Sequence, residues 1–201
     1  MEKTMKIICL GDSITGQANL ERYIKWSFIL ECMCEAAYGP GKIEVLNRGI
    51  GGDTTAGVLA RLDKDVLVEQ PDITIVLLGG NDVDRQVPRD QVKSNLELIA
   101  TRIMACGSKV LLLQYHVLPN PENPETAWIH LDKNNDLIAE VAGEYKIPVL
   151  SLAEPMREAL NRYDHNELVN ATDGVHLNSA GEIVFAKTIF KCLNKLNWLA
   201  E

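Results

Sequence analysis

The feature that most constrains the fold is a regular alternation of short apolar runs with segments of helical periodicity. The run from Ile73 to Leu78 is apolar at nearly every position and has the length of a strand. Continuous apolarity indicates burial on both faces, as in a parallel sheet covered by helices. The next segment, Pro88 to Cys106, places Val92, Leu96, Ile99 and Ile103 at helical spacing. This alternation predicts βαβ units around a central parallel sheet.

The same alternation runs along the whole chain and predicts five strands. We expect the strands near residues 7–10, 43–46, 73–78, 110–113 and 148–152. Helices are expected over residues 20–38, 88–106, 154–161 and 179–196. A further helix is expected to run from a cap at Asp53 or Thr54 to about residue 67, and another, which follows residues 116–126, is expected to end near residue 145. The predicted strand order is flavodoxin-like, 2-1-3-4-5, so the loops after the first three strands meet at one edge. The expected fold class is α/β, in a single domain over residues 1–201.

Composition narrows the class of protein. The net charge of −8 disfavours a nucleic-acid partner, which needs clustered Lys and Arg. No apolar run approaches the roughly 18 residues of a membrane span, and the N-terminal apolar stretch is too short for a signal peptide. We therefore expect a cytoplasmic protein without a membrane span.

A serine follows the first predicted strand directly, in Gly11-Asp12-Ser13. The carboxyl ends of the strands are where open α/β sheets bind ligands. A serine hydroxyl becomes a nucleophile when a base takes its proton and donors stabilise the resulting oxyanion. Asp173 precedes His176 by three residues, which lets the carboxylate reach Nδ1 and leaves Nε2 for a nucleophile. Taken alone, such a pair more often marks a surface histidine.

Candidate donors follow the second and third predicted strands. Backbone N–H groups in the glycine-rich stretch Gly49 to Thr55 suit a developing negative charge near a helix N-terminus. Asn81, after the third strand, offers a side-chain N–H donor. Each stretch on its own also fits a simple turn. Asp12 and Asp82 are expected to accept local hydrogen bonds that hold their turns, and Ser179 and Glu182 have the spacing of a capping box.

Together these motifs resemble the four blocks of the SGNH (GDSL-type) hydrolase family, in its esterase and acetylhydrolase branch. The blocks are Gly11-Asp12-Ser13, Asn47 to Thr55, Gly79-Gly80-Asn81-Asp82 and Asp173-Gly174-Val175-His176. The resemblance implies a three-layer α/β/α sandwich with Ser13 as nucleophile, His176 as general base and then acid, and Asp173 as its orienting partner. It also implies an oxyanion hole formed by the Ser13 N–H, the Gly52 N–H and the Asn81 side chain.

The predicted activity is hydrolysis of a small-molecule ester through an acyl-enzyme on Ser13. No metal or organic cofactor is expected, because His130 and His165 have no partner at ligand spacing. The Pro-rich loop from His116 to Thr126 is expected to form one wall of the site, with His116 and Pro119 contacting substrate. A short acyl ester, such as an O-acetyl group on a carbohydrate, is the first choice. The alternatives are a lysophospholipase or thioesterase acting on longer chains, and a non-catalytic binding module of the same fold.

Overall fold

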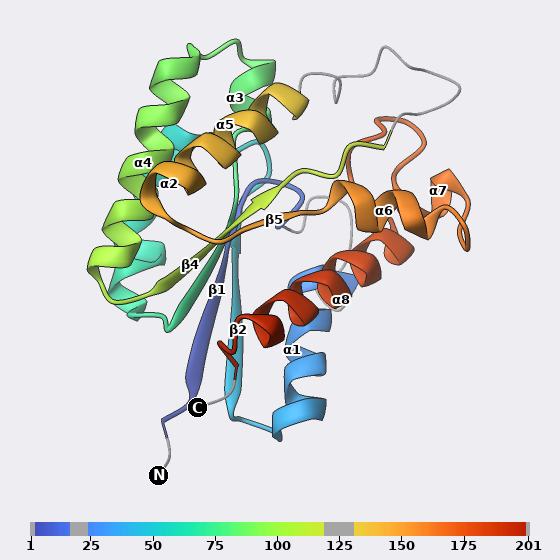
Figure 1. The fold of residues 1–201 in the computed structure, drawn as a ribbon, viewed down its shortest axis with the longest axis horizontal. Coiled ribbons are helices and arrows are strands. Elements are labelled where there is room, and N and C mark those ends of the chain that lie inside the picture. Colours follow the sequence, from blue (N-terminus) through green and yellow to red (C-terminus); the bar gives the residue numbers. More distant parts are fainter. Residues whose placement is uncertain (1–2, 17–23, 119–130, 200–201) are drawn as a thin grey trace.

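The sheet is parallel and has five strands in the order β2-β1-β3-β4-β5, as predicted. We describe it from a computed structural model, in residues 3–16, 24–118 and 131–199 (Figure 1). The strands are β1 (Met5–Gly11), β2 (Ile43–Gly49), β3 (Ile73–Leu77), β4 (Lys109–Gln114) and β5 (Val149–Ser151). Gly11, the last residue of β1, pairs with Gly49 on one side and Leu77 on the other. The loops after β1, β2 and β3 therefore begin at the same level of one sheet edge.

Helices cover both faces of the sheet, which gives three layers (Figure 1). One face carries α2 (Thr55–Asp65), α3 (Gly80–Asp84), α4 (Arg89–Ala105) and α5 (Leu131–Tyr145). The other carries α1 (Trp26–Tyr38), α6 (Ala153–Ala159), α7 (His165–Leu168) and α8 (Ser179–Lys195). A 3-10 turn, Leu67–Glu69, follows α2. None of the helices in the described ranges has the length and apolarity needed to cross a membrane.

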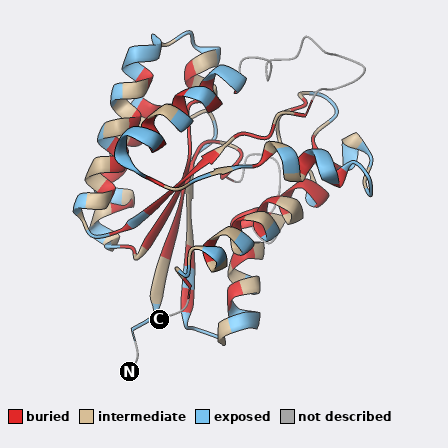
Figure 2. Ribbon diagram, in the orientation of Figure 1, coloured by how far each residue is buried: buried red, intermediate tan, exposed pale blue. Residues whose placement is uncertain are grey.

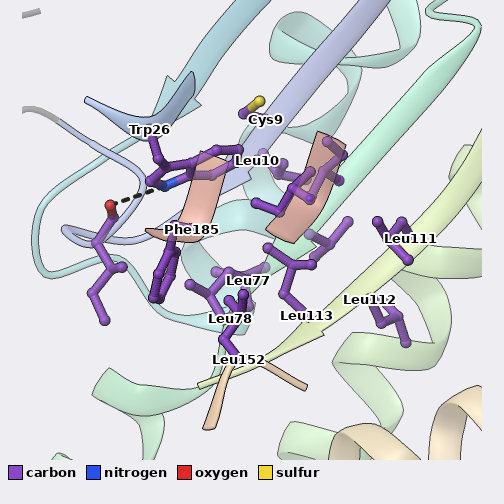
Figure 3. Close-up of a cluster of buried hydrophobic side chains, with 14 of the residues drawn as sticks. Cys9, Leu10, Trp26, Leu77, Leu78, Leu111, Leu112, Leu113, Leu152 and Phe185 are labelled. Atoms are coloured by element: carbon purple, nitrogen blue, oxygen red, sulfur yellow. Dashed lines mark hydrogen bonds between the residues drawn. The ribbon is translucent and has the colours of Figure 1, made fainter. Parts of the chain in front are cut away.

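The core lies along the strands and the inner faces of the helices (Figure 2). Every residue of β3 is buried, including Thr74, as its almost continuous apolar run predicted. Trp26 of α1 and Phe185 of α8 are fully buried beside the strands that carry Leu10 and Leu77 (Figure 3). Burial of one such side chain contributes about 1.5–3 kcal/mol, so this cluster firmly anchors α1 and α8 to the sheet.

One expected helix start and one expected helix cap differ from the structure. Helix α1 begins at Trp26, after Lys25 in an extended conformation, and not near Leu20; residues 17–23 lie outside the described ranges. Helix α8 begins at Ser179, but its N-cap is Asn178 and the expected capping box of Ser179 and Glu182 is absent. The expected cap at Thr54 is confirmed, because its side chain accepts a hydrogen bond from the Gly57 N–H.

The described part of the chain begins and ends near the opposite edge of the sheet from the loops after β1, β2 and β3 (Figure 1). Strand β1 starts there at Met5. After α8, the ring of Trp198 lies 5.8 Å from the ammonium of Lys109, which is the first residue of β4. The amino edge of the sheet therefore holds Met5 and Trp198, and the carboxyl edge holds the loops with the predicted site residues.

Candidate active site

The carboxyl edge of the sheet brings Ser13 and His176 together across 163 positions of the sequence. The Nε2 atom of His176 lies 2.8 Å from Ser13 Oγ. Its other ring nitrogen, Nδ1, lies 3.0 Å from Asp173 Oδ2. The three predicted residues thus form one continuous chain of hydrogen-bonded atoms, and each of them is partly exposed to solvent.

The loop between α7 and α8 holds Asp173 in position. Asp173 Oδ1 accepts hydrogen bonds from the backbone N–H groups of Val175 and His176, at 2.8 and 2.9 Å. Burial alone would raise the pKa of Asp173, but these two N–H groups and the His176 ring outweigh it and hold the pKa below its usual value. The Asp173 side chain therefore stays charged beside the imidazole at neutral pH.

Ser13 lies in a tight turn between Asp12 and Ile14. Asp12 Oδ1 accepts a hydrogen bond of 2.9 Å from the Ile14 N–H, which confirms the expected local role of this carboxylate. The Ile14 carbonyl accepts from Lys25 Nζ at 2.9 Å and from the Trp26 indole N–H at 3.2 Å, the latter drawn as a dashed line in Figure 3. The turn is therefore fixed on both sides of the serine.

Glu182 has a different role from the expected cap. Its carboxylate pairs with Lys25 Nζ at 2.5 Å and accepts from the Trp26 N–H at 2.7 Å. Because the N-cap is Asn178, the third helical position of a capping box is Gly181 and Glu182 is the fourth, so its carboxylate is free to bind the buried ammonium. Helix α8, which follows the His176 loop, is thus tied directly to the segment that holds the Ser13 turn.

Besides the Ser13 N–H, the predicted oxyanion donors lie in the loop after β2 (Gly52) and in the first turn of α3 (Asn81). Gly52 has a φ of +74°, and its carbonyl accepts from Arg85 Nη2 at 2.7 Å. Among the described residues, nothing accepts a hydrogen bond from the backbone N–H of Ser13 or of Gly52. Asn81 Nδ2 donates to the Asp53 carbonyl at 2.8 Å. Because an amide nitrogen carries two hydrogens, this bond orients the Asn81 side chain and leaves one N–H for another acceptor.

Comparison with known proteins places this geometry in a family. Residues 9–182 match the GDSL-like Lipase/Acylhydrolase family. The chain belongs to that family. The matched region begins in β1, just before Ser13, and extends past His176 into α8, so it contains all four predicted motifs.

Relatives within the GDSL-like family carry esterase names. "Esterase TesA" of Pseudomonas aeruginosa is 36% identical over 115 residues, which cover 57% of this chain and 56% of that protein. The chain thus aligns with about half the length of that relative. "Acetylxylan esterase" of Geobacillus stearothermophilus is 25% identical over 92% of both chains. The crystal structure of LAE5, an alpha/beta hydrolase enzyme from the metagenome of Lake Arreo, covers 98% of this chain and 97% of its own, with a TM-score of 0.80 at 23% identity. It shares the fold.

Asp82 of this GDSL-like chain makes a longer-range contact than expected. Its carboxylate accepts from the Thr55 N–H at 2.9 Å and from the Thr55 hydroxyl at 2.7 Å, 27 positions away. Asn95 of α4 donates to the same hydroxyl at 3.1 Å. The expectation of a purely local role was wrong, because the start of α2 presents an N–H that needs an acceptor. The bond joins the loop of Asn81 to the helix that follows Gly52.

Sequence reasoning missed Tyr115, which lies directly after β4. Its hydroxyl donates to Asp12 Oδ2 at 2.5 Å and accepts from the Gly80 N–H at 3.0 Å. The side chain is 1% exposed. An aromatic residue at the carboxyl end of a central strand, next to the candidate wall residue His116, was the available signal.

The structure places His116 behind the triad, with 1% of its surface exposed. Its ring packs edge-to-face on Phe185, with the centroids 5.3 Å apart. Burial lowers the pKa of His116 to about 4, although the nearby backbone of Val175 opposes this shift. Within the described ranges, neither ring nitrogen of His116 makes a hydrogen bond of ordinary geometry. A contact of His116 with substrate stays a prediction, and Pro119 and His130 lie outside the described residues.

The described residues contain no group of three or more His, Cys, Asp or Glu side chains placed to hold a metal ion. The five cysteines are all free thiols.

Proposed function

We propose that this protein is a serine esterase that hydrolyses short acyl esters, with acetyl esters of carbohydrates as its preferred substrates. The observation that carries the proposal is the hydrogen-bonded chain Ser13–His176–Asp173, with contacts of 2.8 and 3.0 Å. Family membership and esterase-named relatives support the same reaction class. The acetyl preference is supported by the acetylxylan esterase, which aligns over 92% of both chains.

The first half of the reaction forms an acyl-enzyme. Ser13 Oγ attacks the ester carbonyl carbon while His176 Nε2 takes the hydroxyl proton. Asp173 accepts the Nδ1–H of His176, which keeps the ring in the required tautomer and stabilises the imidazolium. The carbonyl oxygen becomes an oxyanion that receives hydrogen bonds from the N–H groups of Ser13 and Gly52 and from the Asn81 amide. Collapse of this intermediate breaks the bond to the alcohol, which leaves with the proton from His176.

The second half releases the acid. A water molecule attacks the acyl carbon while His176 again acts as base, and the second tetrahedral intermediate uses the same three donors. Its collapse breaks the bond to Ser13 Oγ, which regains its proton from His176. The partly exposed position of Ser13 and His176 lets both ester and water reach the serine.

Labelling with a fluorophosphonate probe tests the nucleophile. Wild-type protein should bind one probe covalently at Ser13, and Ser13→Ala should bind none. Ser151→Ala is a matched control, because Ser151 is exposed at the end of β5 and should leave labelling unchanged. Folded wild-type protein that stays unlabelled contradicts the enzyme proposal and favours the binding-module alternative.

Hydrolysis rates then test the acyl group. We expect the highest kcat/KM for acetyl esters in a series of p-nitrophenyl esters from acetate to decanoate, and release of acetate from acetylated xylo-oligosaccharides. A maximum at about eight or more carbons favours the lysophospholipase or thioesterase alternative, because longer chains gain about 0.8 kcal/mol per buried methylene only where an apolar groove accepts them. If Ser13 is still labelled in that case, the proposed mechanism stands and only the proposed substrate is wrong.

A further inference from the structure

We propose that Tyr115 is a positioning residue for ester hydrolysis. Its hydroxyl binds both Asp12 and Gly80 and thereby fixes the relative positions of the oxyanion donors at Ser13 and Asn81. The inference rests on the proposed function, because it concerns the donors that stabilise the oxyanion. It is carried by a hydroxyl that bridges the residues immediately before Ser13 and Asn81.

The topology of the sheet makes this bridge possible. Ser13 follows β1 and Asn81 follows β3, whereas Tyr115 follows β4 on the far side of β3. The phenol therefore extends across the end of β3 to reach Asp12, 103 positions away in sequence. It contacts both loops with one oxygen atom, so a displacement of either loop lengthens a bond to the same atom.

The direction of the hydrogen bonds is set by charge and burial. Burial raises the pKa of Tyr115 well above its usual value, so the phenol keeps its proton and donates it to Asp12 Oδ2. Burial also raises the pKa of Asp12, and the hydrogen bonds from Tyr115 and the Ile14 N–H oppose that shift. Three hydrogen bonds result: the Gly80 N–H donates to Tyr115 Oη, the Tyr115 hydroxyl donates to Asp12, and the Ile14 N–H also donates to Asp12. Such a chain of bonds is mutually polarising in a buried site.

The close approach of Gly80 to the phenol depends on the missing side chain. A Cβ at residue 80 would lie 3.2 Å from both Cζ and Oη of Tyr115, and 3.3 Å from Leu131 Cδ2. These distances are tighter than most Cβ contacts, so an alanine there would push the ring aside. The glycine and the tyrosine thus fit one another, and Gly80→Ala offers a second way to disturb the bridge.

The consequence for the reaction follows from the position of the bridge. Asp12 Oδ1 accepts the hydrogen bond from Ile14 that fixes the Ser13 turn. Loss of the Tyr115 bond to Asp12 Oδ2 therefore lets the Ser13 N–H move, and loss of the bond between Tyr115 and Gly80 lets Asn81 move. The transition state is stabilised by hydrogen bonds that point to the position of the oxyanion, not to that of the substrate carbonyl oxygen. A displacement of the donors by a few tenths of an ångström weakens this stabilisation. Loss of the hydroxyl should therefore lower kcat and leave KM nearly unchanged.

The test compares two tyrosine-to-phenylalanine variants. Tyr115→Phe should lower kcat about 10- to 100-fold and change KM by less than about twofold. Its affinity for an alkylboronic acid, which forms a tetrahedral anionic adduct on a serine, should fall in parallel with kcat. Tyr38→Phe is the matched control, because Tyr38 also donates through a 2.5 Å bond, to Asn194 Oδ1 of α8, away from the site. It should keep the wild-type kcat and boronate affinity.

Three results would overturn the inference. The first is a Tyr115→Phe variant with wild-type kcat and boronate affinity; the second is a rise in KM alone. The third applies if Tyr115→Phe does not fold, in which case a Gly80→Ala variant with unchanged kcat decides against the bridge. The wild-type protein separates the two proposals: absence of both hydrolysis and Ser13 labelling contradicts the function itself, whereas an active wild type with an equally active Tyr115→Phe contradicts only the positioning role.

Discussion

Lys25 and Glu182 form an ion pair that is almost completely enclosed. Their atoms Nζ and Oε1 lie 2.5 Å apart, and the side chains are 5% and 0% exposed. The residues are 157 positions apart in sequence. Lys25 also donates to the Ile14 carbonyl and Glu182 also accepts from the Trp26 N–H, so the pair has additional hydrogen-bond partners on both sides. It ties the turn that holds Ser13 to the helix that follows the His176 loop.

Removal of one partner of this ion pair should destabilise the protein strongly. Glu182→Ala leaves the Lys25 ammonium buried without a counter-charge, and we expect the free energy of unfolding to fall by about 3–5 kcal/mol. Urea denaturation measures this change. The double variant Lys25→Met/Glu182→Leu removes both charges and should lose much less. Arg157→Ala is the control, since its partner Glu154 is 64% exposed and the loss should be within about 1 kcal/mol. A double variant as unstable as Glu182→Ala would contradict the electrostatic explanation.

His116 should make the stability of the protein fall in mild acid. The pKa of His116 is about 4 in the folded protein and about 6.5 in an unfolded chain. Between these values the unfolded chain binds a proton that the folded chain does not, so stability is lost as the pH falls through this window. Over the whole window the loss amounts to roughly 3 kcal/mol. Urea unfolding at about pH 7 and about pH 4.5 should show a smaller difference for His116→Gln than for the wild type. Equal differences would mean that His116 titrates normally in the folded state.

Asn81→Ala should fold and lose turnover. The variant removes one of the three proposed oxyanion donors, and a loss of about 10²–10³ in kcat is expected. It also removes the bond to the Asp53 carbonyl, so a control for simple amide loss is needed. Asn194→Ala serves, because that amide donates to the Phe190 carbonyl at 2.9 Å, within α8. Steady-state kinetics on an acetyl ester distinguishes the two, and wild-type turnover in Asn81→Ala would exclude Asn81 from the mechanism.

Two glycine-to-alanine variants should change stability in opposite directions. A Cβ at Gly49 would lie 2.2 Å from the backbone nitrogen of Gly16, in the turn that holds Ser13, so overpacking should cost about 1–3 kcal/mol or more. A Cβ at Gly143, inside α5, would meet nothing within 4 Å. Gly143→Ala should therefore gain about 0.5–1 kcal/mol, because alanine favours a helix. Thermal denaturation measures both, and a lower melting temperature for Gly143→Ala would contradict this account.

Much of the fold is predictable because its signals are local. Almost continuous apolar runs such as Ile73–Leu77 mark strands that are buried on both faces, and Thr54 marks the start of α2 by its own side chain. The hydrogen-bonded contacts of Ser13, His176 and Asp173 were also predictable, since Asp173 and His176 are close in sequence and Ser13 follows the first strand. The parallel arrangement then brings the loops after β1, β2 and β3 to one edge, which unites residues that are far apart in the chain.

The supporting contacts were not predictable in the same way. Ser179 and Glu182 have the spacing of a cap, but Glu182 binds a lysine 157 positions away, which a local pattern cannot reveal. Asp82 and Tyr115 likewise make their bonds to other strands and helices. Lys25, placed between Ile24 and Trp26, was the one sequence signal of a buried charge. Motifs thus predicted that the partly exposed Ser13, His176 and Asp173 lie together, whereas the buried residues that hold them required the structure.

The described part of the chain begins and ends at the amino edge of the sheet, where β1 starts at Met5 and Trp198 packs on Lys109. Ser13 and His176 lie at the other edge. A solid support or fluorescent label attached at the amino edge should therefore leave the edge with Ser13 and His176 toward the solution. Immobilised protein, or two copies joined through this edge, should keep Ser13 accessible in every copy.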